Sequence, residues 1–177
     1  MPPSSLPQSS LPPSSSGDNE DFFLKIELAK QGPIKGESAD DKHKEEIVLK
    51  GWTWGMDVKN AYSVAPTGAE SAGKATVHEL RCSKSVDRAS PVIMQALRSN
   101  DKVKKATLTC RKAGKEQHEY LKITIQNGRL TSYAVNTEGA VPTEEFALSF
   151  KKIEVEYREQ RQDGLLGGSV MYSDEII

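Results

Sequence analysis

The sequence predicts a mostly β protein, an antiparallel β barrel or sandwich with one short flanking α-helix. Three observations support this fold class. Alternating apolar residues recur in about seven short segments, a single segment has a helical pattern, and two strand segments change the phase of their alternation partway. Such a change turns the core residues to solvent unless a bulge absorbs one residue and bends the strand. We expect bulges near His78–Glu79 and Lys151–Lys152, where bending helps the sheet to close.

The N-terminal segment differs in composition from the rest of the chain. Residues 1–17 hold five of the nine prolines and seven serines, and no charged side chain. Such a segment buries too little apolar surface to offset chain entropy, so we predict that residues 1–20 are disordered and that residues 21–177 form one domain. The segment has no basic start and no continuous apolar run, so we do not expect it to be a secretory signal peptide. Nowhere does the chain approach the roughly twenty apolar residues of a membrane span.

The first strand is expected from Phe22 to Leu28, with Phe22, Leu24, Ile26 and Leu28 facing inward and Phe23 facing outward, ending at Gly32-Pro33. A second strand is expected at 47–56. Residues 57–73 contain Pro66, Gly68 and Gly73 and have little periodicity, which predicts a long exposed loop. A loop of this length in a compact domain tends to be a contact element.

One helix is expected after Asp87. Ser90 is a favourable N-cap, Pro91 suits the first helical position, and Ile93, Met94 and Leu97 recur on one face before Ser99-Asn100. Residues 106–110 and 121–125 then alternate around a turn at 113–115, the pattern of a hairpin. After Asn127-Gly128, a further strand is expected at 130–135.

Both tryptophans lie in the second strand, at Trp52 and Trp54, with Thr53 between them. Side chains two residues apart in a strand point the same way, so the indoles share one face and Thr53 lies on the other. Because a chain poor in aromatics rarely exposes both of its tryptophans, we predict that they anchor the core. Thr53 is then expected on the outward surface of this strand.

The charge balance and the cysteine content limit which partners, metal sites and disulfides are expected. The chain has 24 Lys and Arg against 25 Asp and Glu, and this balance gives no electrostatic reason to expect nucleic acid or an anionic membrane. The local basic run at Lys102, Lys104 and Lys105 is too small to change this expectation. Cys82 and Cys110 have no metal-site spacing and are too few for a disulfide framework, so we expect buried free thiols.

The acidic segment around His43 raises the hypothesis of a metal site, because hard cations prefer clustered carboxylates. Its spacing matches no calcium loop, and Lys35, Lys42 and Lys44 are interleaved, so we interpret it as a solvated, salt-bridged loop. No motif for a nucleophile, a zinc protease or a phosphate loop accompanies the histidines, and we expect neither catalysis nor a cofactor. A β barrel that binds a small ligand remains an alternative.

Ordered motifs along the chain resemble a known family. They are Phe23-Leu24-Lys25-Ile26, Ile34-Lys35-Gly36-Glu37-Ser38, His43, Glu46-Ile47, Trp52-Thr53-Trp54-Gly55, Gly73-Lys74, Asp87, Ala89-Ser90-Pro91, Arg111-Lys112-Ala113-Gly114, Gln117, Glu119-Tyr120-Leu121, Val141-Pro142-Thr143-Glu144, Tyr157, Gln160 and Asp163-Gly164. Over about residues 22–168 the sequence is similar to the Hcp (haemolysin-coregulated protein) family, the inner-tube proteins of the bacterial type VI secretion system. The resemblance implies hexameric rings that stack into a tube, which is built in the cytoplasm and expelled without a signal peptide.

The resemblance also implies partners and site residues. Effectors travel in the lumen, and sheath and spike or baseplate proteins contact the tube. Thr53 would face the lumen, and the loop with Asp57, Tyr62, Pro66, Gly68 and Gly73 would contact the adjacent ring. Two segments depart from the family pattern: the Pro/Ser-rich extension and the C-terminal end from Met171.

Overall fold

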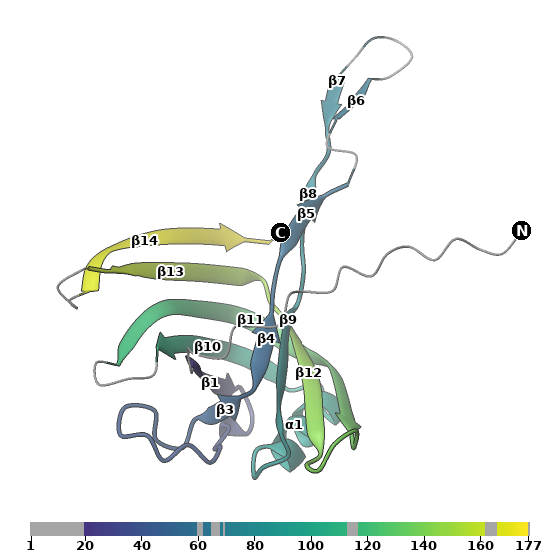
Figure 1. The fold of residues 1–177 in the computed structure, drawn as a ribbon. Helices are drawn as coiled ribbons and strands as arrows, with labels where there is room; N and C mark the ends of the chain where they lie inside the picture. The colour runs from purple at the N-terminus through teal and green to yellow at the C-terminus, as the bar shows by residue number, and fades with distance from the viewer. Residues whose placement is uncertain are drawn as a thin grey trace, which may run out of the picture.

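The computed structural model describes residues 20–59, 62–64, 68, 70–112, 117–161 and 166–176. The described chain forms a β barrel from which a narrow arm projects, with one helix at the end of the barrel away from the arm (Figure 1). The prediction of a mostly antiparallel β fold with a single short helix is confirmed for this part of the chain. The predicted disordered segment, apart from Glu20, lies outside the described residues.

The main sheet contains ten strands, and four short strands make up the arm. The strands are β1 Glu20–Leu28, β2 Gly32–Pro33, β3 Ile47–Leu49, β4 Gly51–Thr53, β5 Met56–Val58, β6 Tyr62–Val64, β7 Glu70–Ala72, β8 Ala75–Val77, β9 Leu80–Ser85, β10 Lys102–Lys112, β11 His118–Asn136, β12 Thr143–Ser149, β13 Lys152–Gln160 and β14 Leu166–Glu175. The helix α1 spans Ser90–Arg98.

The barrel closes because the consecutive strands β3 and β4 pair with opposite ends of the main sheet. The main sheet runs β1-β10-β11-β12-β9-β4, and β3, which precedes β4 directly, pairs with β1 at the other end of this path. Between β3 and β4, the backbone N–H of Lys50 donates to the carbonyl of Ser83 at 2.8 Å. The sheet therefore returns on itself and has no free edge along this path.

The long strand β11 also has two partners, one after the other. Its first part pairs with β10 and β13, and its second part, from Arg129, pairs with β12. The strand thus runs through Asn127-Gly128, where we expected a break, and the prediction of two separate strands is wrong. The chain is interrupted at Phe150-Lys151 between β12 and β13, and at His78-Glu79 between β8 and β9, so the prediction of bulges within continuous strands is wrong. The phase changes mark places where one strand ends and the next pairs with a different partner.

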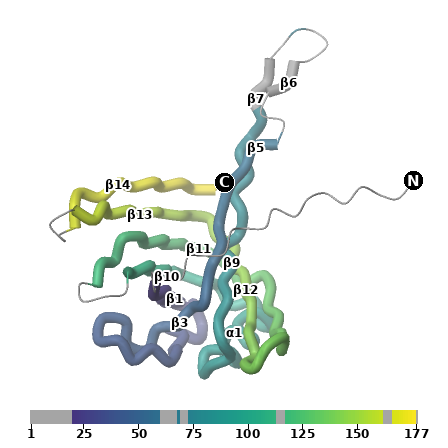
Figure 2. Tube along the Cα trace, viewed as in Figure 1, coloured from purple at the N-terminus to yellow at the C-terminus, as the bar shows by residue number. Residues whose placement is uncertain are grey.

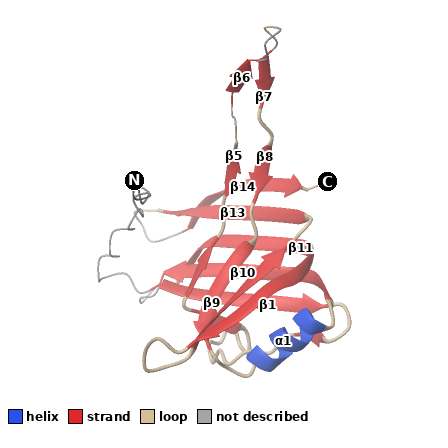
Figure 3. Cartoon of the chain, turned by 90° about the vertical axis from the view of Figure 1, so that its right-hand side faces the viewer, coloured by secondary structure: helices blue, strands red, loops and turns tan. Residues whose placement is uncertain are grey.

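Helix α1 covers the lower end of the barrel (Figure 3). Its N-cap is Ala89 and makes no side-chain cap bond, so the prediction of Ser90 as the N-cap is wrong. Ser90 is instead the first helical residue, and its hydroxyl accepts from Lys84 Nζ at 2.9 Å and donates to Glu144 at 2.8 Å. Of the three predicted face residues, Ile93 is buried and Leu97 packs against the core, but Met94 is exposed.

Lys84 and Glu144 form a buried ion pair beneath this helix, and both side chains are completely buried. Lys84 also contacts Asp87 at 2.6 Å, and Tyr133 donates its hydroxyl to Glu144 at 2.5 Å. Burial and the neighbouring Glu144 carboxylate raise the pKa of Tyr133 well above its usual range. A buried charge is tolerated only when paired and hydrogen-bonded, and here the bonds join β9, β11, β12 and α1.

Apolar side chains from all barrel strands meet in one core that includes Leu24, Ile26, Leu108, Ile123 and Phe146. Phe23, which the alternation placed outward, is buried as well, because the loop before β3 folds over it. The barrel interior in the described part of the chain is thus filled by side chains. The described helix α1 is too short to cross a membrane.

Candidate functional site

The segment predicted as an irregular loop is a β ribbon. Strands β5 and β8 pair antiparallel from Met56 opposite Val77 to Val58 opposite Ala75, and β6 pairs with β7 farther out. The β5–β8 part of the ribbon projects from the barrel as an arm (Figure 2). The prediction of little regular structure is therefore wrong, although the described side chains of Met56–Val58 are exposed as expected. We call Met56–Val77 the arm.

The arm carries the residues predicted to contact a neighbouring ring. Asp57 lies in β5 and binds the exposed His78 at its base, with Oδ2 and Nε2 at 2.6 Å. Tyr62 begins β6, Gly68 has a positive φ of 81°, and Gly73 lies between β7 and β8. Pro66 lies outside the described residues. Their role in ring contacts stays a prediction.

The arm also exposes apolar surface: Met56 and Val58 are 45% and 43% exposed. A two-stranded ribbon without a third strand or a core is only marginally stable in water. Apolar side chains on such a ribbon indicate a surface that another molecule covers.

The strand register places Thr53 and the tryptophans on opposite sides of the barrel wall. Trp52 lies opposite Cys82, which lies opposite Phe146, which lies opposite Tyr133, and this row includes the buried side chains of Cys82 and Phe146. Residues in register share a face of the sheet. Thr53 belongs to the next row and is exposed, so it lies on the outward face.

The outward face next to Thr53 carries mainly small or polar side chains. Two rows cross the four strands β4, β9, β12 and β11: Thr53, Arg81, Ala147 and Ser132, then Gly51, Ser83, Glu145 and Ala134. All of these residues except the buried Ala147 line a hollow of about 520 Å³, together with Trp52, Cys82, Tyr133 and Phe146 of the inner row; we call it the polar hollow. Arg81 and Glu145 are its only charged residues, with Arg81 also 3.7 Å from Glu79. The face can admit another chain closely, because few large side chains stand on it.

The tryptophans are less buried than a full core position would be. Trp52 and Trp54 are both partly buried and pack against the core cluster. The indole Nε1 of Trp54 is buried and has no hydrogen-bond partner among the described residues. Their role as core anchors stays a prediction.

The outermost strand of the sheet is unusually apolar on its surface. β14 pairs only with β13, and Val170, Met171 and Tyr172 are 71%, 59% and 39% exposed. Tyr157, in register with Val170, is 47% exposed. An exposed apolar edge strand is a template for association, so this hairpin is a second surface that indicates a protein partner.

The structure also shows a cluster that sequence reasoning missed. His43 is buried, with Nδ1 2.5 Å from Glu46 and Nε2 2.5 Å from Glu119, and its ring stacks on Phe23 with centroids 4.4 Å apart. The interpretation of this segment as a solvated loop is therefore wrong for His43. Glu119 is 76 residues away in sequence, so no local spacing could have predicted the contact.

An ion pair also fastens this loop to the barrel. Arg111 Nη2 donates to Asp40 at 2.7 Å and to Asp21 at 3.0 Å, and its guanidinium lies over the Phe23 ring. The hydrogen bond from Arg111 lowers the pKa of Asp40 to about 2. Among the described residues no group of three or more His, Cys, Asp or Glu is arranged to hold a metal ion.

A closed, filled β barrel with a projecting arm, an apolar edge strand and a polar outward face has the features of a structural subunit. Comparison with known proteins identifies the family. The family described as "Type VI secretion system effector, Hcp" matches residues 23–157. The protein hcp1 of Pseudomonas aeruginosa is 38% identical over 160 residues, which cover 88% of this chain and 94% of that protein.

Solved structures agree with this match. The crystal structure of Hcp1 from Salmonella typhimurium has a TM-score of 0.68 and 29% identity, covering 88% of this chain and 94% of that one. A structure of a type six secretion system protein has a TM-score of 0.72 and 28% identity, covering 84% and 91% of the two chains. The chain belongs to the Hcp family, and it is a structural tube subunit of the type VI secretion system.

Proposed function

We propose that this chain closes into a hexameric ring, that the rings stack through the arm, and that the polar hollow around Thr53 faces the channel of the tube. Effectors carried in the channel then contact Thr53 and its small neighbours. Sheath and spike or baseplate proteins contact the assembled tube from outside and at its end. The subunit is made in the bacterial cytoplasm, leaves through the secretion system itself, and performs no catalysis.

The exposed apolar surface of the chain is the observation that carries this proposal. The arm exposes Met56 and Val58, and the β13–β14 hairpin exposes Tyr157, Val170 and Met171. In an isolated monomer these apolar side chains stay in contact with water, whereas an assembly buries them against neighbouring copies. The polar hollow is the contrasting surface, because its small polar side chains remain solvated in an open channel.

Ring formation is tested by native mass spectrometry and negative-stain imaging of the purified protein. We expect six copies of the 19.4 kDa chain and round particles with an open centre. A species of one or two subunits at micromolar concentration would contradict the ring, and it is the result that a ligand-carrying barrel would give.

Stacking through the arm is tested separately. Val58→Lys places a charge on the exposed apolar surface of β5, and we expect intact single rings that no longer stack into tubes. Val86→Lys is the matched control, since Val86 lies outside the arm and is 46% exposed, close to the 43% of Val58. Equal stacking of both variants would remove the arm from the ring contact.

A further inference from the structure

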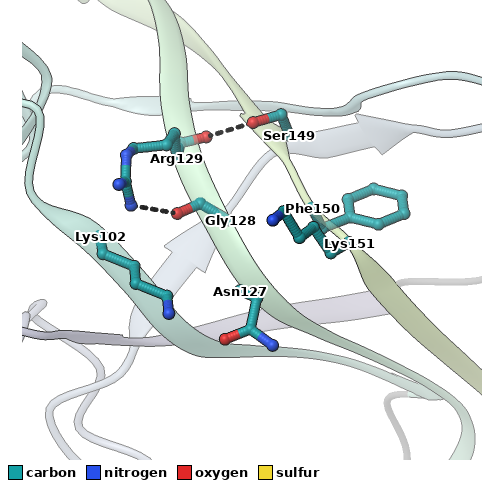
Figure 4. Close-up of a pocket in the computed structure, with 7 residues that line it drawn as sticks. All are labelled: Lys102, Asn127, Gly128, Arg129, Ser149, Phe150 and Lys151. Carbon is teal, nitrogen blue, oxygen red and sulfur yellow. Dashed lines mark hydrogen bonds between the residues drawn. The ribbon is translucent and has the colours of Figure 1, made fainter. Parts of the chain in front are cut away.

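A notch opens in the barrel wall where β11 changes partner from β13 to β12 (Figure 4). It has a volume of about 510 Å³ and is lined by Lys102, Asn127, Gly128, Arg129, Ser149, Phe150 and Lys151. We call it the basic notch. Gly128 makes its shape possible, because a Cβ atom there would lie 2.1 Å from the carbonyl oxygen of Ser149. The preceding Asn127 has a φ of 56°, which turns the strand at this corner.

Three cations line the basic notch, and none forms an ion pair with a described residue. Lys102 and Lys151 are exposed, and Arg129 donates only to the carbonyl of Gly128, at 3.3 Å. The carboxylate next to Lys102 in sequence, Asp101, is buried and accepts from two backbone N–H groups in the turn after β1. By contrast, the neighbouring Lys152 is 3.5 Å from Glu154. Among the described residues, therefore, no carboxylate neutralises the positive charge of the basic notch.

The positions of Lys102 and Arg129 destabilise this part of the sheet. Lys102 and Arg129 are register partners on β10 and β11, so two like charges stand directly opposite each other. Like charges in this position destabilise an antiparallel pair. The chain as a whole has a net charge of -1, so an excess of lysine on the surface does not account for the cluster. An anion held between the two strands would remove the repulsion.

We propose that the basic notch binds clustered carboxylates on an acidic segment of a protein partner. Its cations come from β10, from β11 and from the link between β12 and β13, a spread that suits carboxylates spaced along a chain. A site for phosphate normally adds backbone N–H groups from a helix N-terminus or a loop. Here the backbone N–H of Lys151 already donates to the carbonyl of Gln126 at 3.1 Å, and side chains supply the charge. The site rests on these contacts and does not depend on ring formation.

The experiment measures binding of a fluorescein-labelled hexaglutamate peptide by fluorescence anisotropy at low salt, with a hexaglutamine peptide as the uncharged comparison. The test variant is Lys102→Glu with Lys151→Glu. The control is Lys42→Glu with Lys44→Glu, two exposed lysines without an ion pair to a described residue, which changes the net charge equally. We expect the test variant to bind about five- to tenfold more weakly, as loss of two exposed ion pairs predicts, and the control to stay within about twofold of wild type.

Carbodiimide cross-linking locates the peptide, because it joins peptide carboxylates to nearby lysine amines, and we expect links at Lys102 and Lys151. Equal weakening in both variants, or equal binding of hexaglutamine, would overturn the proposal. So would displacement of the peptide by inorganic pyrophosphate at a lower concentration than by unlabelled hexaglutamate, since that result assigns the notch to phosphate. Native mass spectrometry of the same samples separates loss of binding from loss of the ring.

Discussion

Replacing Lys84 by Met should remove the cation from the buried network beneath α1 while keeping most of the side-chain volume. Glu144, completely buried, would then keep hydrogen bonds from Tyr133 and Ser90 but have no cation beside it. Breaking a buried ion pair by removing one partner costs about 3 to 5 kcal/mol, against a total stability of about 5 to 15 kcal/mol for a domain. We expect a large loss of stability and low yield of folded protein.

The assay is urea unfolding followed by tryptophan fluorescence at one fixed protein concentration, because assembly adds to apparent stability. Lys84→Met with Glu144→Gln should recover part of the loss, since the amide still bonds Tyr133 and carries no charge. Lys152→Met is the control: its pair with Glu154 is partly exposed at 3.5 Å and should cost less than about 1 kcal/mol. A cost for Lys84→Met equal to that control, or no recovery in the double variant, would refute the reasoning.

Three further predictions concern the site and the loop. Arg111 lowers the pKa of Asp40 from 3.8 to about 2, so the ionised Asp40 stabilises the folded protein above the unfolded-state pKa, and this stabilisation is lost as the pH falls through the folded-state pKa. The difference in melting temperature between wild type and Asp40→Asn should therefore shrink as the pH is lowered from 3.8 to about 2, and a constant difference would contradict this. Burial raises the pKa of the Cys110 thiol to about 12, so iodoacetamide should label it slowly in the native protein and quickly in urea; fast native labelling would show that the barrel opens there. Thr53→Gln should keep ring mass and stability within about 0.5 kcal/mol while a carried effector no longer co-purifies, and unchanged co-purification would place cargo elsewhere in the channel.

Much of the barrel could be predicted because its strands alternate between core and solvent. Leu24, Ile26 and Leu28 are buried as the period of two requires, and the phase changes near His78 and Lys151 coincide with strand interruptions. The strands of the arm could not be predicted in this way. Each is three residues long, which is too short for an alternation of apolar and polar residues to stand out.

The buried ion pair left a signal that could have been used. Lys84 continues the inward series of Leu80 and Cys82, and Glu144 stands two residues before the inward Phe146. Two opposite charges at inward positions of two strands predict a partner for each other. The cluster around His43 left no such signal, because a loop and the start of β11 meet only after the barrel has closed.

The attachment of the β13–β14 hairpin has a consequence for how the protein opens. β13 is held by β11 over Leu121–Gln126, and β14 is held only by β13, whereas the barrel closes without either strand. Because Ile153 of β13 is buried in the core, we expect β14 to separate from β13 first, while β1, β10, β11, β12, β9 and β4 stay closed. Backbone amides of β14 should exchange with deuterium earlier than those of β10, and contact with a neighbouring subunit along Val170 and Met171 should slow that exchange.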